Sequence, residues 1–157
     1  MPLAKTPYFY HYRKYAMKVK DSYPVFITKQ LQLTKEYYVK WFDFEVFFES
    51  TWFILVESKG EQPYFIAFMD EQHPTSPPSM PAINSSAGVF LTLEVENATE
   101  EYKRLTDSGL DICYHLKDEE WGQKRFGLID PNGIYIDIVE QTNPKDGYWD
   151  QYMPISR

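Results

Sequence analysis

The sequence predicts an α+β fold made of two tandem modules, each with the order strand, helix and three strands. Two observations support this prediction. The spacing of apolar residues changes from that of a strand to that of a helix and back to that of three strands, and this order occurs twice. The two halves also align when Gln30 is placed over Asn97 and Ala67 over Asp137, which indicates an internal repeat.

The chain of 157 residues is long enough for one compact domain, and its 43% hydrophobic and 18% aromatic residues provide material for a core. The patterns divide it into five segments. A basic, aromatic N-terminal arm (1–21) precedes a first βαβββ module (22–72). A linker rich in proline and serine (73–87) leads to a second βαβββ module (88–141), and a C-terminal tail (142–157) follows.

The first module begins with a predicted strand in residues 23–29. Residues 30–44 predict a helix, because their large apolar side chains recur at roughly helical spacing. These side chains are Leu31, Leu33, Tyr37, Tyr38, Trp41 and Phe42. Three further strands are predicted in residues 45–50, 51–58 and 63–70, where β-branched and aromatic residues predominate.

The second module begins with a predicted strand in residues 88–96. A helix is predicted in residues 98–108, because Asn97 is a good N-cap and Glu100 follows it three residues later, close to a capping box. Gly109 suits the left-handed position just after a helix. The helix is therefore expected to end there.

Three strands complete the second module, and they are predicted in residues 110–116, 123–130 and 133–141. Between the last two, residues 130–133 read Asp-Pro-Asn-Gly, which is typical of a tight hairpin turn. The final strand places one carboxylate, Asp137, among apolar residues. That carboxylate is the first candidate for a functional residue.

Charge and composition exclude several classes of protein. The formal net charge is −7, and after Lys20 the chain carries 11 basic side chains against 23 acidic ones, which argues against binding to nucleic acid. No segment is long and apolar enough for a membrane span. The N-terminal arm lacks the apolar core of a secretory signal, and the single cysteine, Cys113, has no partner for an intrachain disulfide, so we expect a cytoplasmic protein.

The second module resembles the vicinal oxygen chelate superfamily, which includes glyoxalase I, bleomycin resistance proteins and extradiol dioxygenases. The resemblance rests on Trp121-Gly122, Arg125-Phe126, the turn at 130–133 and the alternating final strand. It implies two modules that form an open, curved mixed sheet around a concave cavity. It also implies a homodimer, and it leaves the activity open, since one scaffold hosts unrelated enzymes and metal-free binding proteins.

The resemblance also implies where a metal would be held, on the first and last strands of each module. The corresponding positions here are Tyr23, Ala67, Phe90 and Asp137. Only Asp137 is a usual ligand of a divalent ion, whereas a stable site generally needs three or more protein ligands. We therefore expect no metal site of the family type and no cofactor.

Alternation along the strands assigns the residues that face the cavity. In the strand at 88–96, Phe90 and Glu94 fall on the face opposite the helix, and in the last strand Tyr135 and Asp137 do. With the Trp-Gly loop and one histidine, these residues form the predicted ligand-binding set: Trp121, Asp137, Phe90, Tyr135, Glu94 and His115.

Several members of this set have more than one interpretation. Asp137 either receives a cationic or hydroxylated ligand, or forms a salt bridge with Arg125 or Lys29, or acts as a base. Trp121 either stacks on a planar cation or anchors its loop. His115, if it points inward, pairs with Glu94 or Asp137 and serves as an acid–base group near neutral pH.

The leading hypothesis is a metal-free protein similar to the bleomycin resistance proteins, which binds a small aromatic or cationic molecule in its cavity. The alternative is a glyoxalase- or dioxygenase-type enzyme, a lyase or isomerase, with an atypical site. A third hypothesis is an interaction module, in which the tyrosine-rich N-terminal arm and the aromatic tail with Tyr148, Trp149 and Tyr152 cap a neighbouring subunit or fill the concavity.

Overall fold

The computed structural model describes residues 21–73 and 89–152. The predicted N-terminal arm, except Asp21, and nearly all of the predicted linker lie outside the described residues, as does the end of the tail. Within the described ranges the element order is the predicted one, strand, helix and three strands, in each module. The two-module α+β fold is thereby confirmed.

The first module consists of one helix and four strands. Its helix α1 spans Leu31–Phe42. Its strands are β1 (Val25–Thr28), β2 (Glu45–Glu49), β3 (Phe53–Glu57) and β4 (Phe65–Asp70). They form one sheet in the order β1-β4-β3-β2, in which β1 and β4 are parallel and the other neighbours are antiparallel.

The second module repeats this topology. Its helix α2 spans Ala98–Asp107. Its strands are β5 (Leu91–Glu94), β6 (Tyr114–Glu119), β7 (Gln123–Ile129) and β8 (Tyr135–Gln141), and a short 3₁₀ helix, η3, follows at Tyr148–Tyr152. The sheet order is β5-β8-β7-β6, with β5 and β8 parallel.

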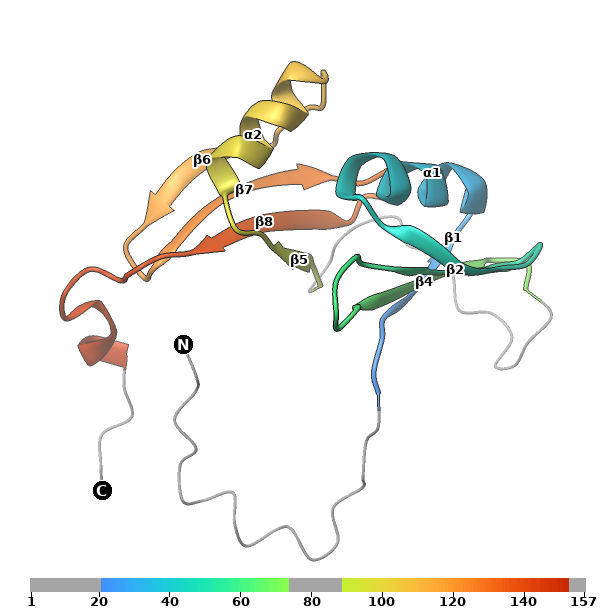
Figure 1. Ribbon diagram of the computed structural model, residues 1–157, viewed down its shortest axis with the longest axis horizontal. Coiled ribbons are helices and arrows are strands. Elements are labelled where there is room, and N and C mark those ends of the chain that lie inside the picture. The colour runs from blue at the N-terminus through green and yellow to red at the C-terminus, as the bar shows by residue number, and fades with distance from the viewer. Residues whose placement is uncertain (1–20, 74–88, 153–157) are drawn as a thin grey trace, which may run out of the picture.

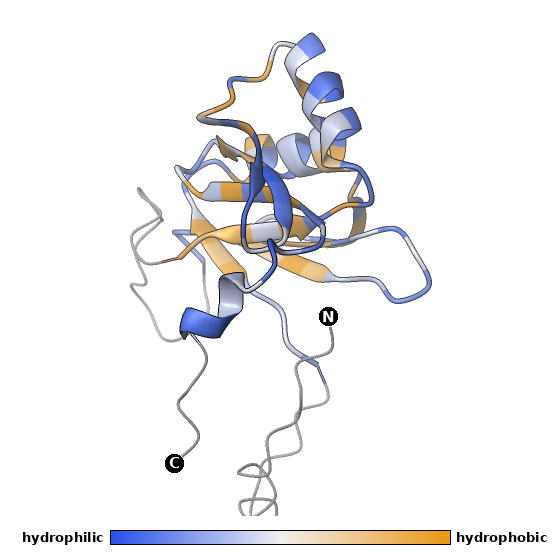
Figure 2. Ribbon diagram, turned by 90° about the vertical axis from the view of Figure 1, so that its left-hand side faces the viewer, coloured by the Kyte–Doolittle hydropathy of each residue, from blue (hydrophilic) through white to orange (hydrophobic). Residues whose placement is uncertain are grey.

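The two helices lie on the same side of the two sheets, the upper side in Figure 1. Helix α1 covers the first sheet and α2 covers the second. The opposite face of each sheet has no helix on it within the described ranges, and we call it the open face. The strands carry the most apolar stretches and α2 is largely hydrophilic, as Figure 2 shows.

The ends of the helices follow from their capping residues. The Asn97 side chain accepts a hydrogen bond of 3.0 Å from the backbone N–H of Glu100, which satisfies one of the free donors in the first turn of α2. Gly109 has φ of 84°, so it is in the left-handed conformation predicted for it. Helix α1 ends at Asp43, which takes the left-handed conformation without being glycine.

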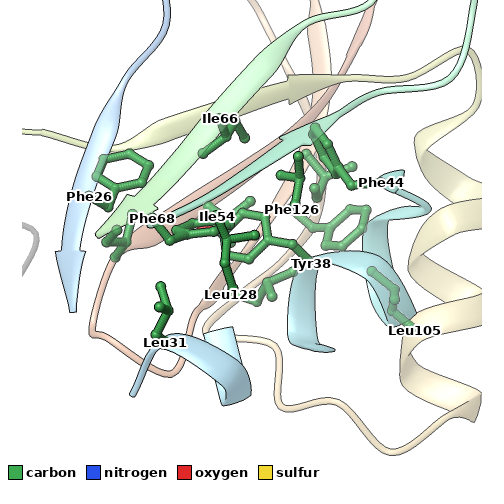
Figure 3. Close-up of a cluster of buried hydrophobic side chains, with 14 of the residues drawn as sticks. Phe26, Leu31, Tyr38, Phe44, Ile54, Ile66, Phe68, Leu105, Phe126 and Leu128 are labelled. Atoms are coloured by element: carbon green, nitrogen blue, oxygen red, sulfur yellow. The ribbon is translucent and has the colours of Figure 1, made fainter. Parts of the chain in front are cut away.

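One hydrophobic core joins the two modules. Tyr38 of α1 is fully buried, and its ring lies 4.7 Å from that of Phe68 of β4. Phe126 of β7 and Leu105 of α2 belong to the same cluster of buried side chains, which Figure 3 shows between the two sheets and their helices. Because the core is shared, we expect the two modules to fold as one unit.

The turn at residues 130–133 forms the polar part of the junction between the modules. Asn132 accepts a hydrogen bond of 2.6 Å from Thr28 and donates one of 2.9 Å to Thr34, both in the first module. Tyr38 donates a hydrogen bond of 3.0 Å to Asp130. The predicted hairpin turn therefore also attaches one module to the other.

Two strand predictions need correction. The strand predicted at 110–116 lies at 114–119 instead, because Leu110 and Ile112 pack against the core from the loop that follows α2. The strand predicted at 88–96 is confined to Leu91–Glu94 among the described residues. In both cases the apolar residues indicate burial. Loop residues can be buried as strand residues are, so the pattern does not mark the ends of the strand.

Candidate functional site

The open face of the second sheet gathers the charged side chains of three strands. Ile136 and Ile138 of β8 pack into the core beneath α2, so the alternate residues of β8 face the other way, as the alternation predicts. Asp137 pairs with Gly127 of β7. Arg125 is two residues before Gly127 in the same strand, so its side chain lies on the same face of the sheet as that of Asp137. The residues collected there from β6, β7 and β8 are Tyr114, Lys117, Glu119, Arg125, Tyr135 and Asp137.

Arg125 lies at the centre of this cluster. Its Nε donates to Glu119 at 3.1 Å, and its Nη1 lies 3.3 Å from Asp137 Oδ2. The guanidinium carbon is 5.0 Å from the ring centre of Tyr114 and 4.9 Å from that of Trp121. Two carboxylates and two aromatic rings thus hold the guanidinium in one place.

Asp137 has one paired and one unpaired oxygen. Its side chain is 5% exposed, and Oδ2 receives the ion pair from Arg125. Oδ1 is buried, and no hydrogen-bond partner for it exists in the described part of the chain. Burial raises the pKa of the Asp137 carboxyl, and the guanidinium of Arg125 offsets this only in part.

Glu119, at the other side of Arg125, is fully engaged. It accepts hydrogen bonds from Tyr114 and Arg125, and Lys117 lies 3.4 Å from it. Burial acts to raise the pKa of Glu119, but the hydrogen bonds from these three residues outweigh it and lower the pKa. Glu119 is therefore a fixed anion that positions Arg125.

Tyr135 and Phe90 form an aromatic border next to Asp137. Their ring centres are 6.0 Å apart in an edge-to-face arrangement, and Phe90 is 58% exposed. The Tyr135 hydroxyl lies over Gly127, where an added Cβ would stand 2.0 Å from it. Burial raises the pKa of Tyr135 to about 12, so the hydroxyl keeps its proton at neutral pH.

Trp121 lies in the turn between β6 and β7, and its ring has two neighbours from the chain itself. The guanidinium of Arg125 lies over the ring, and the ring centre of Tyr148 in the C-terminal tail is 6.4 Å away. Trp149 donates to the Trp121 carbonyl at 3.1 Å. Trp121 therefore anchors its loop and the tail, and the described part of the tail packs on this turn.

His115 is the one predicted site residue that does not point inward. Its Nδ1 lies 2.8 Å from the hydroxyl of Tyr102, a residue of α2, so it is on the helix-covered side of the sheet. The pairing register of β6 shifts between Tyr114 and Lys117, and this irregularity interrupts the alternation. The expected pairing of His115 with Glu94 or Asp137 is not formed.

The four positions implied for a metal do not provide a ligand set. Ala67 and Phe90 have no donor atom in their side chains, and Asp137 is engaged with Arg125. Across residues 21–73 and 89–152, no group of three or more His, Cys, Asp or Glu side chains is placed to hold an ion. These residues do not fit the metal of the family type.

A second concave feature runs along β5. It is a groove of about 1010 Å³ between the first module and this strand. Glu94 lines it, whereas Asp137, Trp121, Tyr135 and Phe90 do not. The predicted set is thus divided between the groove and the open face, although Gln141 donates to Glu94 at 2.9 Å across the boundary.

Sequence reasoning missed part of the charged cluster. It identifies Arg125 only as one candidate partner of Asp137, and it does not place Tyr114, Lys117 and Glu119 beside that arginine. The sequence pattern of β6 could not identify these residues, because the predicted strand begins too early in the chain and the register of the actual strand is irregular. The strict alternation of β7 and β8 carries the correct prediction for Asp137 and Tyr135.

Comparisons with known proteins agree with the geometry. A family model described as the glyoxalase/bleomycin resistance protein/dioxygenase superfamily matches residues 22–138. None of the curated proteins compared matches the chain. No helix in the described ranges has the length and apolar character needed to cross a membrane.

Several solved structures are similar to this one. A glyoxalase/bleomycin resistance protein/dioxygenase from Nocardioides is 18% identical with a TM-score of 0.68, and the match covers 85% of this chain and 91% of that one. A virulence protein from Salmonella typhimurium is 13% identical with a TM-score of 0.65, covering 81% and 100%. A lactoylglutathione lyase from Agrobacterium tumefaciens is 12% identical with a TM-score of 0.60, covering 79% and 96%. At these identities the likeness shows the fold alone.

Proposed function

We propose that this chain, which belongs to the glyoxalase/bleomycin resistance protein/dioxygenase superfamily, binds a small aromatic or cationic molecule on the open face of its second sheet, without a metal of the family type. The ligand site is centred on Asp137 and bordered by Phe90 and Tyr135. Glu94 lies at its edge. Trp121 contributes by holding Arg125, and His115 takes no part.

The unpaired Oδ1 of Asp137 is the observation that carries the proposal. A buried acceptor without a hydrogen bond costs about 1–3 kcal/mol, and a ligand that donates to it removes this cost. The other oxygen is fixed by Arg125 at 3.3 Å, so the direction in which Oδ1 accepts is also fixed. The site is therefore preorganised for one N–H or O–H donor.

The surroundings of Asp137 favour an aromatic ligand that bears such a donor. Phe90 offers an exposed ring beside it, in edge-to-face contact with Tyr135. Lys117 and Arg125 balance the two carboxylates of the cluster, and Glu94 adds a further negative charge nearby. An aromatic amine meets both the ring and the acceptor.

Titration with a panel of aromatic amines tests this proposal, with tryptophan fluorescence and thermal shift as readouts. We expect saturable binding to the wild-type protein, and affinity at least about tenfold lower in Asp137→Asn, since a hydrogen bond to a charged group contributes about 1.5–3 kcal/mol. Asp118→Asn is the matched control, because Asp118 is exposed and its ion pair in the described part of the chain is with Lys124, outside the cluster around Arg125. Equal affinity in all three proteins would overturn the proposed site.

Elemental analysis of the purified protein tests the absence of a metal. We expect less than stoichiometric amounts of zinc, nickel, manganese and iron, because only one of the four family positions, Asp137, carries a usual ligand of a divalent ion. One equivalent of any of these ions that is lost in Asp137→Asn would contradict the proposal and favour metal-dependent chemistry.

The second candidate function is an enzyme, a lyase or isomerase, and the raised pKa of the Asp137 carboxyl favours it. Carboxyl groups whose pKa lies nearer neutrality are often acids or bases in catalysis. Turnover that survives chelation and disappears in Asp137→Asn would support this candidate. Saturable binding without turnover supports the binding protein.

We also propose that the protein is a cytoplasmic homodimer. Strand β1 has a single neighbour among the described strands, so it offers an edge to a second copy. The exposed thiol of Cys113 suits a reducing compartment. Light scattering should give a mass of twice 18.7 kDa, and a mass of 18.7 kDa at all concentrations would contradict the dimer.

A further inference from the structure

The groove along β5 is acidic and has an apolar floor. Six carboxylates line it, against one basic side chain, Arg104. Arg104 pairs with Glu101 and Lys59 pairs with Asp43, which leaves four carboxylates without a basic partner within the described ranges. These four are Asp21, Glu94, Glu96 and Glu140. The apolar lining includes Phe42, Phe44, Tyr64, Phe65, Leu91 and Leu93.

One wall of the groove is the edge of β5 that faces away from β8. Among the strands that the structure describes, β5 pairs with β8 alone. The backbone N–H of Val95 bonds to Val139 of β8, and backbone groups alternate in direction along a strand, so those of Thr92 and Glu94 point away from β8. Both residues line the groove. The groove therefore presents to an extended segment backbone donors and acceptors that have no partner among residues 21–73 and 89–152.

The sequence just before the described range has the complementary composition. From Met1 to Lys20 the arm contains five basic side chains and no acidic one. In residues 14–20, Tyr15, Met17 and Val19 fall on one side of an extended chain and three lysines with Ala16 on the other, a pattern typical of a half-buried strand. Asp21, the residue that follows this segment, lines the groove itself.

We propose that residues 14–20 of the arm bind in this groove as an added strand on the edge of β5. The apolar side of the segment packs on the floor, and Lys14, Lys18 and Lys20 face the unpaired carboxylates. Seven extended residues span about 23 Å, and the four residues of β5 span about 13 Å, so the segment reaches along the whole strand.

Hydrogen exchange in the full-length protein tests the proposal. We expect the amides of Thr92 and Glu94 to be protected in the wild type, and to exchange at least about tenfold faster in the double variant Lys18→Glu/Lys20→Glu. The matched control is Lys29→Glu/Lys40→Glu, which changes the net charge equally at exposed lysines that do not line the groove. Unchanged protection of Tyr38 and Phe126 in both variants shows that the fold is intact.

A charge exchange sharpens the test. We expect the combination of Lys18→Glu/Lys20→Glu with Glu94→Lys/Glu96→Lys to restore the protection that either pair removes, because opposite charges again face each other. Fast exchange of Thr92 and Glu94 in the wild type would overturn the proposal, as would equal protection in the arm variant. Protection that increases with protein concentration would also overturn it and assign the edge to a second copy.

Discussion

The carboxyl group of Asp137 is subject to two opposing influences. Burial disfavours its charge, while the guanidinium of Arg125 favours it, and the net result is a raised pKa. The neighbouring Glu119 has the opposite balance, because three hydrogen-bond donors stabilise its charge. Two acids about the same arginine therefore differ in function: Glu119 fixes Arg125, and Asp137 is left with an oxygen for a ligand.

The raised pKa makes the stability of the protein depend on pH. Because the folded pKa of Asp137 lies above its unfolded value of 3.8, its ionisation costs folding free energy. The contribution of the neutral carboxyl to stability is complete below pH 3.8 and is lost as the pH rises through the folded pKa.

Chemical denaturation of wild-type and Asp137→Asn proteins between about pH 4 and pH 8 measures this effect. We expect the free energy of unfolding of the variant, relative to wild type, to increase with pH, with a slope of up to about 1.4 kcal/mol per pH unit between the two pKa values. A relative stability that decreases with pH would mean that the folded pKa is lowered.

The helices and strands differ in how strongly their own sequences define them. Helix α2 has a side-chain cap and a left-handed glycine after its end, and its predicted bounds agree with the structure. Helix α1 has no side-chain cap, and it depends on buried residues such as Tyr38. Strand β6 has an irregular register, its predicted bounds are wrong, and the condition that His115 points inward is not met.

Removing the cap of α2 should destabilise the protein by a predictable amount. We expect Asn97→Ala to lower the free energy of unfolding by about 1 kcal/mol, because the N–H of Glu100 loses its acceptor. Asn97→Asp keeps an acceptor and adds a favourable charge at the helix N-terminus, so it should retain the wild-type stability. Urea denaturation compares the three proteins, and equal losses in both variants would exclude capping as the cause.

The whole molecule depends on contacts between its halves. The side chains of Tyr38 and Phe126, one from each module, lie in one buried cluster, and hydrogen bonds from Thr28 and Tyr38 to the turn at 130–133 accompany it. Neither sheet can keep its helix-covered face dry when the other module is absent. The two modules should therefore unfold together.

Phe126→Ala tests this coupling. We expect a loss of about 3–5 kcal/mol, since Phe126 is fully buried, and a single transition for reporters in both modules. Amide signals of Tyr38 and Ile138 in denaturant follow the two modules separately. Phe48→Ala is the matched control, because Phe48 is 52% exposed and its loss should cost less than about 1 kcal/mol. Separate transitions would show that the modules are independent.

The order of elements, the cap of α2, the hairpin turn and the face of the last strand on which Asp137 lies could be predicted from the sequence alone. These features depend on local chemistry: strand alternation, helical spacing and turn residues act over a few positions. Three features became visible only in the folded structure: Arg125 pairs with one oxygen of Asp137, His115 faces α2, and an acidic groove follows β5. These features depend on register and on the packing of one module against the other, which join residues far apart in the chain and leave no periodic signal in the sequence.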